Sequence, residues 1–134
     1  MADHQRELGL KLNIKYNEQG LVPAIVQDVD TGDILMMGWM NALAVKQTLQ
    51  LKKATFYSRS RNKMWVKGES SGNTQDVVEF LVDCDQDTII LKCKSNGPCC
   101  HVGYNSCFYR ASDPQENMTF IAEKVYNPED VYKK

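Results

Sequence analysis

Cysteine is the residue type in this chain with the clearest potential for metal chemistry. All five cysteines lie between Cys84 and Cys107, and His101, one of the two histidines, lies in the same stretch. Thiolate and imidazole groups are the usual ligands of zinc in proteins. The five are Cys84, Cys93, Cys99, Cys100 and Cys107. Because His4 lies in the polar N-terminal segment, a soft-metal site here must consist mostly of thiolates.

The cysteines do not indicate a disulfide framework. Their number is odd, and the N-terminal residues MADHQRELGL contain no apolar stretch behind a positive cluster, so no secretory signal is predicted. Thiols are kept reduced in the cytosol. We therefore expect a cytoplasmic protein whose cysteines bind metal or, as the alternating pattern around Cys93 indicates, pack in the core.

Three of the cysteines are candidates for one zinc site. Cys84 follows an expected strand, and Cys100 and Cys107 lie in a glycine-containing segment. Three protein ligands with an open fourth position are typical of catalytic zinc, which lowers the pKa of bound water, whereas four ligands make a closed structural site. His101 could be the fourth ligand, or it could stand beside the metal as a proton carrier. The spacing is not that of a zinc knuckle, so both readings remain open.

An acidic pentapeptide, residues 83–87, has a carboxylate at every second position: Asp83, Asp85 and Asp87. In an extended strand this spacing places the three carboxylates on one face and Cys84 on the other. Carboxylates that converge repel one another unless a cation neutralises them, and Mg²⁺ prefers oxygen ligands of this kind. The alternative is a polar hairpin tip with Cys84 as a small core residue.

A segment rich in arginine and serine precedes the acidic one. Serine and arginine alternate over residues 58–61, so on a strand Arg59 and Arg61 would share one face. Such cations can hold phosphate together with hydroxyl and backbone donors, and the ring of Trp65 can stack on a base. The alternative is an exposed strand whose charges are solvated. The remaining candidate donors are Lys67, Ser70 and Ser71.

Length and charge limit the functions that these residues can serve. The chain has 134 residues and 15.3 kDa, which predicts one domain. Its 16 basic and 17 acidic residues give a net charge of −1, which argues against a strongly basic nucleic-acid-binding protein. No apolar run approaches the roughly 20 residues that cross a bilayer. We expect a small-molecule ligand, with neither nucleic acid nor membrane as partner.

Hydrophobic periodicity and turn residues predict the elements that position these groups. Asn41 is a suitable N-cap for a helix that reaches about residue 53, and Asn127 and Pro128 can begin a short last helix. Val78, Phe80 and Val82 are expected on one face of their strand. Strands are expected at 21–28, 34–40, 54–61, 63–68, 74–82 and 88–94, and a loop at 95–107. The fold class is therefore α+β, β-rich and mainly antiparallel, with one central helix and a short C-terminal helix.

Four motifs follow one another in a fixed order at residues 58–61, 65–72, 83–87 and 97–108. Their sequence and spacing resemble the phosphoribosyl-AMP cyclohydrolase family of histidine biosynthesis over about residues 20–110. The resemblance implies a hydrolase that opens the adenine ring of 1-(5-phosphoribosyl)-AMP between N1 and C6 with zinc-activated water. The product is the phosphoribosylformimino-aminoimidazole carboxamide ribonucleotide. One domain, residues 1–134 with a core at about 20–110, would carry this activity.

The resemblance also implies ligands and a partner. Zinc would be shared between the subunits of an intertwined homodimer, because one cysteine comes from the other subunit. His101, beside a zinc ligand, is the candidate proton carrier, and Trp65 either packs on the purine or belongs to the core. The implied zinc ligands are Cys100, Cys107 and, from the other subunit, Cys84. The implied Mg²⁺ ligands are Asp83, Asp85 and Asp87, and the expected phosphate contacts are Arg59, Arg61, Lys67, Ser70 and Ser71.

Two residues depart from the pattern of the family. Cys99 stands where a small residue is usual, which adds a second thiol for metal binding or oxidation next to Cys100, and Val102 stands where threonine is frequent. Many relatives carry a second, pyrophosphohydrolase domain, which catalyses the preceding reaction. We expect no room for it in 134 residues, so that activity should reside in another protein. The competing hypothesis is a binding module in which His101 closes a structural zinc site, and the basic segment holds a nucleotide or RNA without chemistry.

Overall fold

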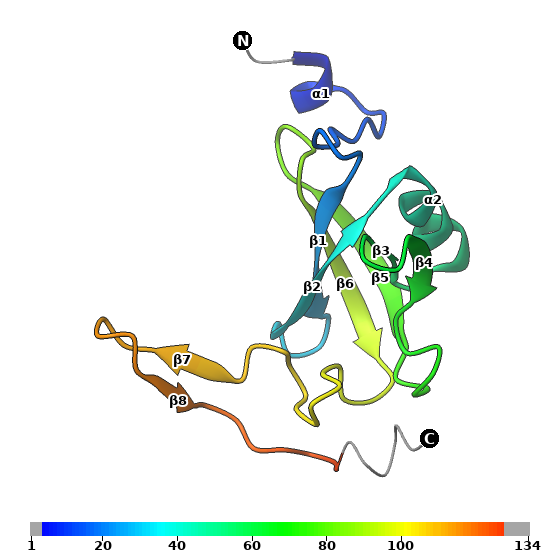
Figure 1. Cartoon of the computed structure of the whole chain (residues 1–134). Helices are drawn as coiled ribbons and strands as arrows, with labels where there is room; N and C mark the ends of the chain where they lie inside the picture. Colours follow the sequence, from blue (N-terminus) through cyan, green and yellow to red (C-terminus); the bar gives the residue numbers. More distant parts are fainter. Residues whose placement is uncertain (1–3, 128–134) are drawn as a thin grey trace.

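The computed structural model describes residues 4–127 (Figure 1). Within them lie two helices and eight strands, most of which pair in an antiparallel manner. The helices are α1 (His4–Leu8) and α2 (Ala42–Leu51). The strands are β1 (Val22–Asp28), β2 (Ile34–Met40), β3 (Thr55–Ser58), β4 (Lys63–Val66), β5 (Gln75–Val82), β6 (Ile89–Ser95), β7 (Arg110–Ser112) and β8 (Met118–Phe120).

The central sheet has four strands in the order β2-β1-β6-β5 (Figure 1). The neighbours β1 and β2 are antiparallel, as are β5 and β6, while β1 and β6 are parallel. The expected α+β, mainly antiparallel class is confirmed. The parallel pair was not predicted, because strand patterns identify which residues are extended but not which distant strand they pair with.

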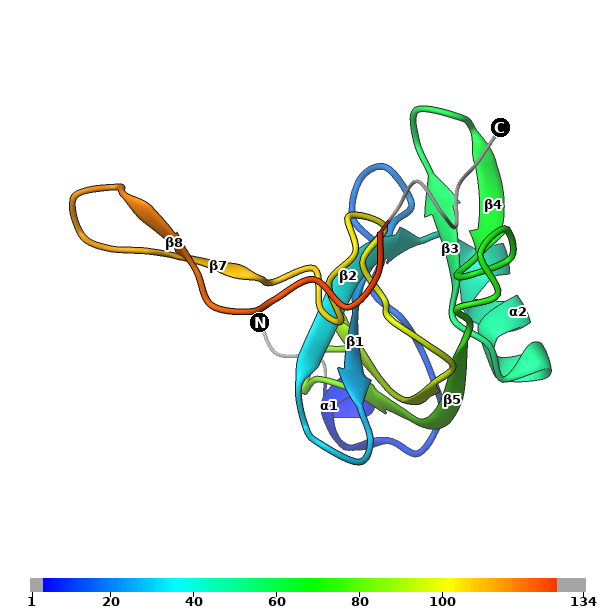
Figure 2. The same ribbon diagram turned by 90° about the horizontal axis from the view of Figure 1, so that it is seen from below.

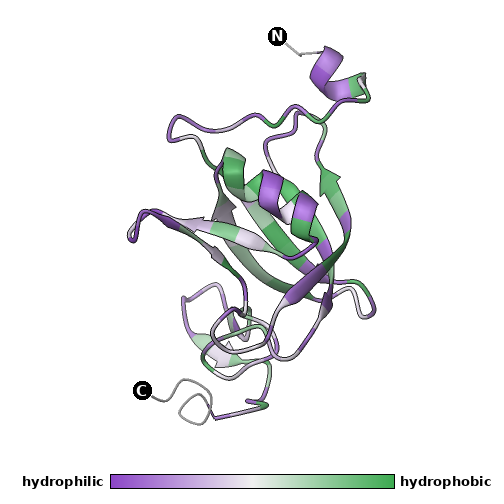
Figure 3. Cartoon of the chain, turned by 90° about the vertical axis from the view of Figure 1, so that its right-hand side faces the viewer, coloured by the Kyte–Doolittle hydropathy of each residue, from purple (hydrophilic) through white to green (hydrophobic). Residues whose placement is uncertain are grey.

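The core lies along the two middle strands. On β1, Val22, Ala24 and Val26 are fully buried, and β6 buries alternate residues in the same way. This period of two is the signature of one buried face. Cys93 is part of that face at 0% exposure, so its predicted core position is confirmed. Figure 3 shows hydrophobic residues along these strands and hydrophilic residues on the outward side of α2.

Helix α2 connects the central sheet to the β3–β4 hairpin. The Asn41 side chain accepts a hydrogen bond from the Ala44 N–H at 2.8 Å, as predicted for an N-cap. The helix ends at Lys52, whose φ of 55° is left-handed. The buried Thr48 hydroxyl accepts from the Thr55 N–H at 3.1 Å, which fixes the start of β3 against the helix. Sequence reasoning therefore identified the main helix correctly and placed its end about two residues late.

Three features of the fold differ from the predictions. The short helix α1 lies in the N-terminal segment, for which no element was expected. A bulge in β5 between Val77 and Glu79 shifts its register, so Val77 and Phe80 pack against the core while Val78 is 60% exposed. The prediction that Val78 shares a face with Phe80 is therefore wrong.

The segment after the cysteine-containing loop forms a hairpin of β7 and β8 that projects from the rest of the chain (Figures 1 and 2). No pattern in the sequence predicted it, because its strands are only three residues each. The expected C-terminal helix falls mainly outside the described residues. Within residues 4–127, no helix has the length and apolar character required to span a membrane.

Candidate functional site

A cleft of about 530 Å³ lies between the β3–β4 hairpin and the cysteine-containing loop. It gathers residues from three of the four sequence motifs. Five of the six residues expected to bind substrate line it, as does the expected proton carrier. These lining residues are Arg61, Trp65, Lys67, Ser70, Ser71 and His101.

The wall of this cleft is built by β4 and the loop that follows. The ring of Trp65 packs on the buried Phe56 with ring centroids 5.1 Å apart and also lines the cleft, so both readings of its role fit. Gly68 has a φ of +85°, and a Cβ there would collide with the backbone at Asn73. Only glycine therefore allows the loop 68–73 to close tightly beside the cleft.

Arg59 occupies a second cleft of about 600 Å³, which shares Ser58, Ser60 and Trp65 with the first. Strand β3 ends at Ser58, and residues 59–62 form a turn with Asn62 at a φ of 52°. The expected strand arrangement, with Arg59 and Arg61 on one face, is therefore wrong. The Arg59 guanidinium instead lies 5.7 Å from the ring centroid of Trp39 and donates to Gln19 Oε1 at 3.3 Å.

The loop 96–107 brings three thiols together. The Cys100 N–H donates to the Tyr104 carbonyl at 3.0 Å, and the Cys107 N–H donates to the Leu35 carbonyl of β2 at 2.7 Å. These bonds fold the loop back on itself and attach it to the sheet. The Cys107 thiol lies close enough to those of Cys99 and Cys100 for them to affect its pKa. A group of adjacent soft donors of this kind suits zinc, so the residues present fit the metal expected there.

The thiols influence one another's ionisation. The hydrogen bond from Cys107 lowers the pKa of Cys99, against the effect of burial, and the positive charge of Lys67 acts in the same direction. The bond with Cys99 and burial raise the pKa of Cys107. Lys67 also lines the first cleft, so this cleft and the thiols are neighbours. By contrast, burial and the charges of Asp76 and Asp28 raise the pKa of Cys93 to about 12, as expected for a core thiol.

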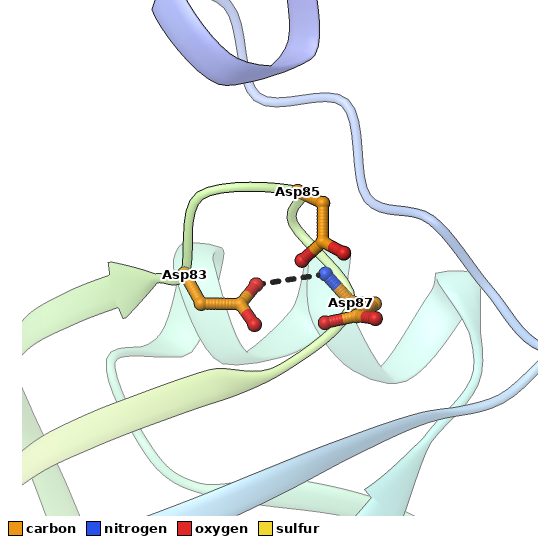
Figure 4. A group of neighbouring side chains, drawn as sticks. All are labelled: Asp83, Asp85 and Asp87. Atoms are coloured by element: carbon orange, nitrogen blue, oxygen red, sulfur yellow. Dashed lines mark hydrogen bonds between the residues drawn. The ribbon is translucent and has the colours of Figure 1, made fainter. Parts of the chain in front are cut away.

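The three aspartates converge at the turn between β5 and β6 (Figure 4). One oxygen from each lies within 4.8 Å of the others. The cause is not strand alternation, as predicted, because residues 83–87 form a turn in which Gln86 has a left-handed φ of 56°. Asp83 Oδ1 accepts from the Asp87 N–H at 3.0 Å, which draws the ends of the turn together.

Close packing of the carboxyl groups perturbs their ionisation. The hydrogen bond with Asp83 raises the pKa of Asp87, and Asp85 adds to the effect. Partial burial raises the pKa of Asp83, but hydrogen bonds from the Asp87 side chain and backbone outweigh it and lower that pKa overall. Three carboxylates that converge at this distance fit a divalent cation such as Mg²⁺, which would offset their mutual repulsion.

Gln86 is a residue of this turn that sequence reasoning assigned no role. Its side chain accepts from the Asn13 N–H at 2.7 Å and donates to the Arg6 carbonyl at 3.0 Å. Its own carbonyl accepts from the Lys15 N–H at 2.7 Å. Gln86 thus fastens the N-terminal segment to the acidic turn. Its side chain is only 4% exposed, whereas a residue at a polar hairpin tip, the alternative considered for this segment, would be exposed.

The acidic turn that contains Cys84 and the loop that contains the other two expected zinc ligands lie at opposite ends of β6 (Figure 1). The acidic turn precedes β6 and the cysteine loop follows it, and seven residues of strand span roughly 23 Å. Cys84 is exposed and lines a groove of about 340 Å³ together with Leu10, Leu12 and Val82. A single chain therefore brings Cys100 and Cys107 together but leaves Cys84 apart.

The family model and the similar proteins that match this chain all belong to the same family. Residues 36–109 match the model of the phosphoribosyl-AMP cyclohydrolase family. A phosphoribosyl-AMP cyclohydrolase of Chlorobium phaeobacteroides is 56% identical over 121 residues, covering 90% of this chain and 88% of the relative. One of Chlorobaculum parvum is 54% identical over the same shares, and one of Chlorobium limicola is 52% identical over 100% of this chain and 98% of its own length. The chain belongs to the phosphoribosyl-AMP cyclohydrolase family and is an enzyme.

Proposed function

We propose that this chain hydrolyses the N1–C6 bond of the adenine ring in 1-(5-phosphoribosyl)-AMP, a step of histidine biosynthesis. The observation that carries the proposal is the cleft between the β3–β4 hairpin and the cysteine loop, in which Lys67 and His101 lie beside the thiols of that loop. The net charge of −1 favours a small substrate over nucleic acid. We also propose a cytoplasmic location and a single domain over residues 1–134, with its core at about 20–110.

The shape of the two adjoining clefts suits a substrate with two phosphorylated sugars. The purine carries one ribosyl group on N1 and another on N9, so the two phosphates diverge from the ring. The clefts meet at Ser58, Ser60 and Trp65. We place the purine against Trp65, one phosphate near Arg61 and Lys67 with Ser70 and Ser71 as further donors, and the other phosphate near Arg59.

The placement of the phosphates predicts a selective effect on substrate binding. Arg59→Ala and Arg61→Ala should each raise KM about tenfold, the cost of one charge-assisted hydrogen bond, with a smaller effect on kcat. Lys63→Ala, which removes an exposed cation of β4 outside both clefts, should leave KM unchanged. Steady-state kinetics of the three variants measure this, and equal KM values for all three would refute the placement.

The residues that hold zinc in this proposal are Cys100 and Cys107 of one chain and Cys84 of a second copy. The chemistry that bound zinc supplies is activation of water near neutral pH. The ribosyl group on N1 gives the ring amidinium character, so C6 accepts the water oxygen. His101 in the cleft is placed to deliver a proton to N1 as the N1–C6 bond breaks. The exocyclic nitrogen stays on C6, which becomes the carboxamide.

The acidic turn explains how both metal sites could serve one substrate. Cys84 lies between Asp83 and Asp85, so a second chain that brings its Cys84 to the cysteine loop also brings its three carboxylates. Mg²⁺ held there would neutralise substrate phosphate next to the arginine and lysine side chains. We therefore propose a homodimer with two sites, each assembled from both chains.

The magnesium assignment predicts a loss of metal affinity on charge removal. Asp85→Asn should weaken Mg²⁺ binding about tenfold or more, because one of three converging carboxylates loses its charge. Asp30→Asn, in an exposed turn elsewhere, provides the matched control. Isothermal titration with MgCl₂ measures both variants. Unchanged affinity in Asp85→Asn would place Mg²⁺ elsewhere.

The reaction itself is tested by incubating the zinc-loaded chain with 1-(5-phosphoribosyl)-AMP and recording the product mass. Ring opening adds one molecule of water without release of phosphate or adenine. A product with that mass and an intact second phosphate supports the proposal. Recovery of unchanged substrate alone would refute it.

A further inference from the structure

Both tryptophans of this chain line the second cleft, the one of about 600 Å³ that contains Arg59. Trp39 belongs to β2 and Trp65 to β4, and both side chains are half-buried. The proposed function places the purine against Trp65 but gives Trp39 no role. An aromatic ring beside a cation in a cleft can act on a ligand directly or through that cation.

The packing of β2 on β3 fixes the position of Trp39. Its neighbour Gly38 lies against the ring of Phe56, and a Cβ on Gly38 would come within 2.5 Å of that ring. Phe56 is fully buried and also packs on Trp65. Glycine therefore allows the two strands to approach closely, and both tryptophans are anchored beside the same core residue.

Arg59 is an exposed residue whose side chain is nonetheless held in place. Its guanidinium lies 5.7 Å from the ring centroid of Trp39, within the range of a cation–π interaction. Gln19 Oε1 accepts a hydrogen bond from the same guanidinium at 3.3 Å. A free arginine side chain loses rotamer entropy when a ligand immobilises it, whereas a side chain that is already held loses less. These contacts therefore prepare Arg59 to bind an anion.

The turn that carries Arg59 is held by bonds that leave its guanidinium unused. The Arg61 N–H donates to Ser58 Oγ at 3.3 Å. The Tyr57 hydroxyl donates to Asn62 Oδ1 across the turn. Arg59 is also the only charged residue that lines the second cleft within the described part of the chain. Binding of an anion in this cleft therefore depends on one side chain and on what orients it.

We propose that Trp39 is a positioning residue for the substrate, because its indole ring holds the Arg59 guanidinium in the orientation that binds one of the two ribosyl phosphates. This inference rests on the proposed function and identifies the residue that prepares its second phosphate site. Trp39 acts on the binding of the substrate. It does not act on the proton transfer, which belongs to the first cleft beside His101.

Substitution of Trp39 should change KM and not kcat. Trp39→Leu should raise KM about three- to fivefold and leave kcat within about twofold of the parent chain, because it removes the cation–π contact but no group of the first cleft. Trp39→Phe keeps an aromatic face and should recover most of the loss. Tyr16→Leu removes a partly buried aromatic ring outside both clefts and should leave KM unchanged.

A double variant tests whether Trp39 acts through Arg59. If it does, Trp39→Leu combined with Arg59→Ala should have the KM of Arg59→Ala alone. Losses that add in the double variant, or a Trp39→Leu variant with the KM of the parent chain, would overturn the proposal. Equal KM values in Trp39→Phe and Trp39→Leu would overturn it as well. Circular dichroism verifies that each variant is folded.

Fluorescence tests the same contact without turnover. In Trp65→Phe, Trp39 is the only tryptophan, so the emission reports on Trp39 alone. Ribose 5-phosphate, the group that both ends of the substrate share, should change this emission in a saturable manner. Adding Arg59→Ala should raise its dissociation constant about tenfold. An emission that does not respond, or that responds equally without Arg59, would overturn the proposal.

The two measurements distinguish a failure of this inference from a failure of the proposed function. A saturable change in Trp39 emission, with a parent chain that does not open the ring, would support the phosphate site and refute the proposed function. Ring opening by the parent chain, with an unchanged KM in Trp39→Leu, would overturn the role of Trp39 alone.

Discussion

Cys107→Ser should remove most of the zinc from the protein and lower the rate of ring opening by about 10³-fold or more. The Cys107 thiol lies near those of Cys99 and Cys100, both of which affect its pKa. Serine keeps the size of the side chain and the backbone bond to the Leu35 carbonyl but is a poor zinc ligand. Activation of water by a metal contributes several kcal/mol, and each 1.4 kcal/mol is about tenfold in rate.

The matched control for this variant is Cys93→Ala. Cys93 is fully buried in β6, and its thiol packs in the core rather than in the cysteine loop. Its loss should cost stability, about 1 kcal/mol for the sulfur atom removed, with zinc content and kcat unchanged. Zinc per chain is measured by atomic emission. Full zinc content in Cys107→Ser, together with normal kcat, would rule out Cys107 as a ligand.

His101→Ala should lower kcat by about 10²- to 10⁴-fold while zinc content stays the same. His101 lines the cleft beside the β3–β4 hairpin, and the carbonyl of its neighbour Cys100 accepts hydrogen bonds from the Gly103 N–H and the Tyr126 hydroxyl. The fold of the loop therefore does not depend on the imidazole. Loss of a general acid that protonates the leaving nitrogen typically costs this amount.

The same variant distinguishes the enzyme from a binding module in which His101 is a structural zinc ligand. If His101 closed the zinc site as a fourth ligand, His101→Ala would lose zinc and unfold at a lower temperature. His4→Ala, at the other histidine in α1, should match the parent chain in zinc, kcat and melting temperature. Zinc loss in His101→Ala, with no chemistry detectable in the parent chain, would favour the binding module.

Local patterns predicted the elements of the fold well because the forces that specify them are local. Asn41 precedes an apolar stripe and caps α2, and the alternation in β1 and β6 marks their buried faces. The parallel pairing of β1 with β6 and the bulge at Val77 depend on partners distant in the sequence. No local pattern encodes those partners.

The sequence identified several residues that line the cleft, but it did not predict how the structure arranges them. The aspartates converge as expected, yet through a turn held by the Asp87 N–H rather than through an extended strand. Arg59 and Arg61 separate into two clefts because β3 ends at Ser58, one residue before the first arginine. The role of Gln86 emerges only when the N-terminal segment and the acidic turn, far apart in the chain, lie side by side.

We propose that the purine ring opens in the cleft beside the thiols with the help of zinc. Ultraviolet absorbance of 1-(5-phosphoribosyl)-AMP, followed at neutral pH after addition of the purified chain, tests it directly. We expect a spectral change whose rate rises with protein concentration. The change should stop after zinc chelation and resume when zinc is added. A constant spectrum with folded, zinc-loaded protein in the presence of Mg²⁺ would contradict it.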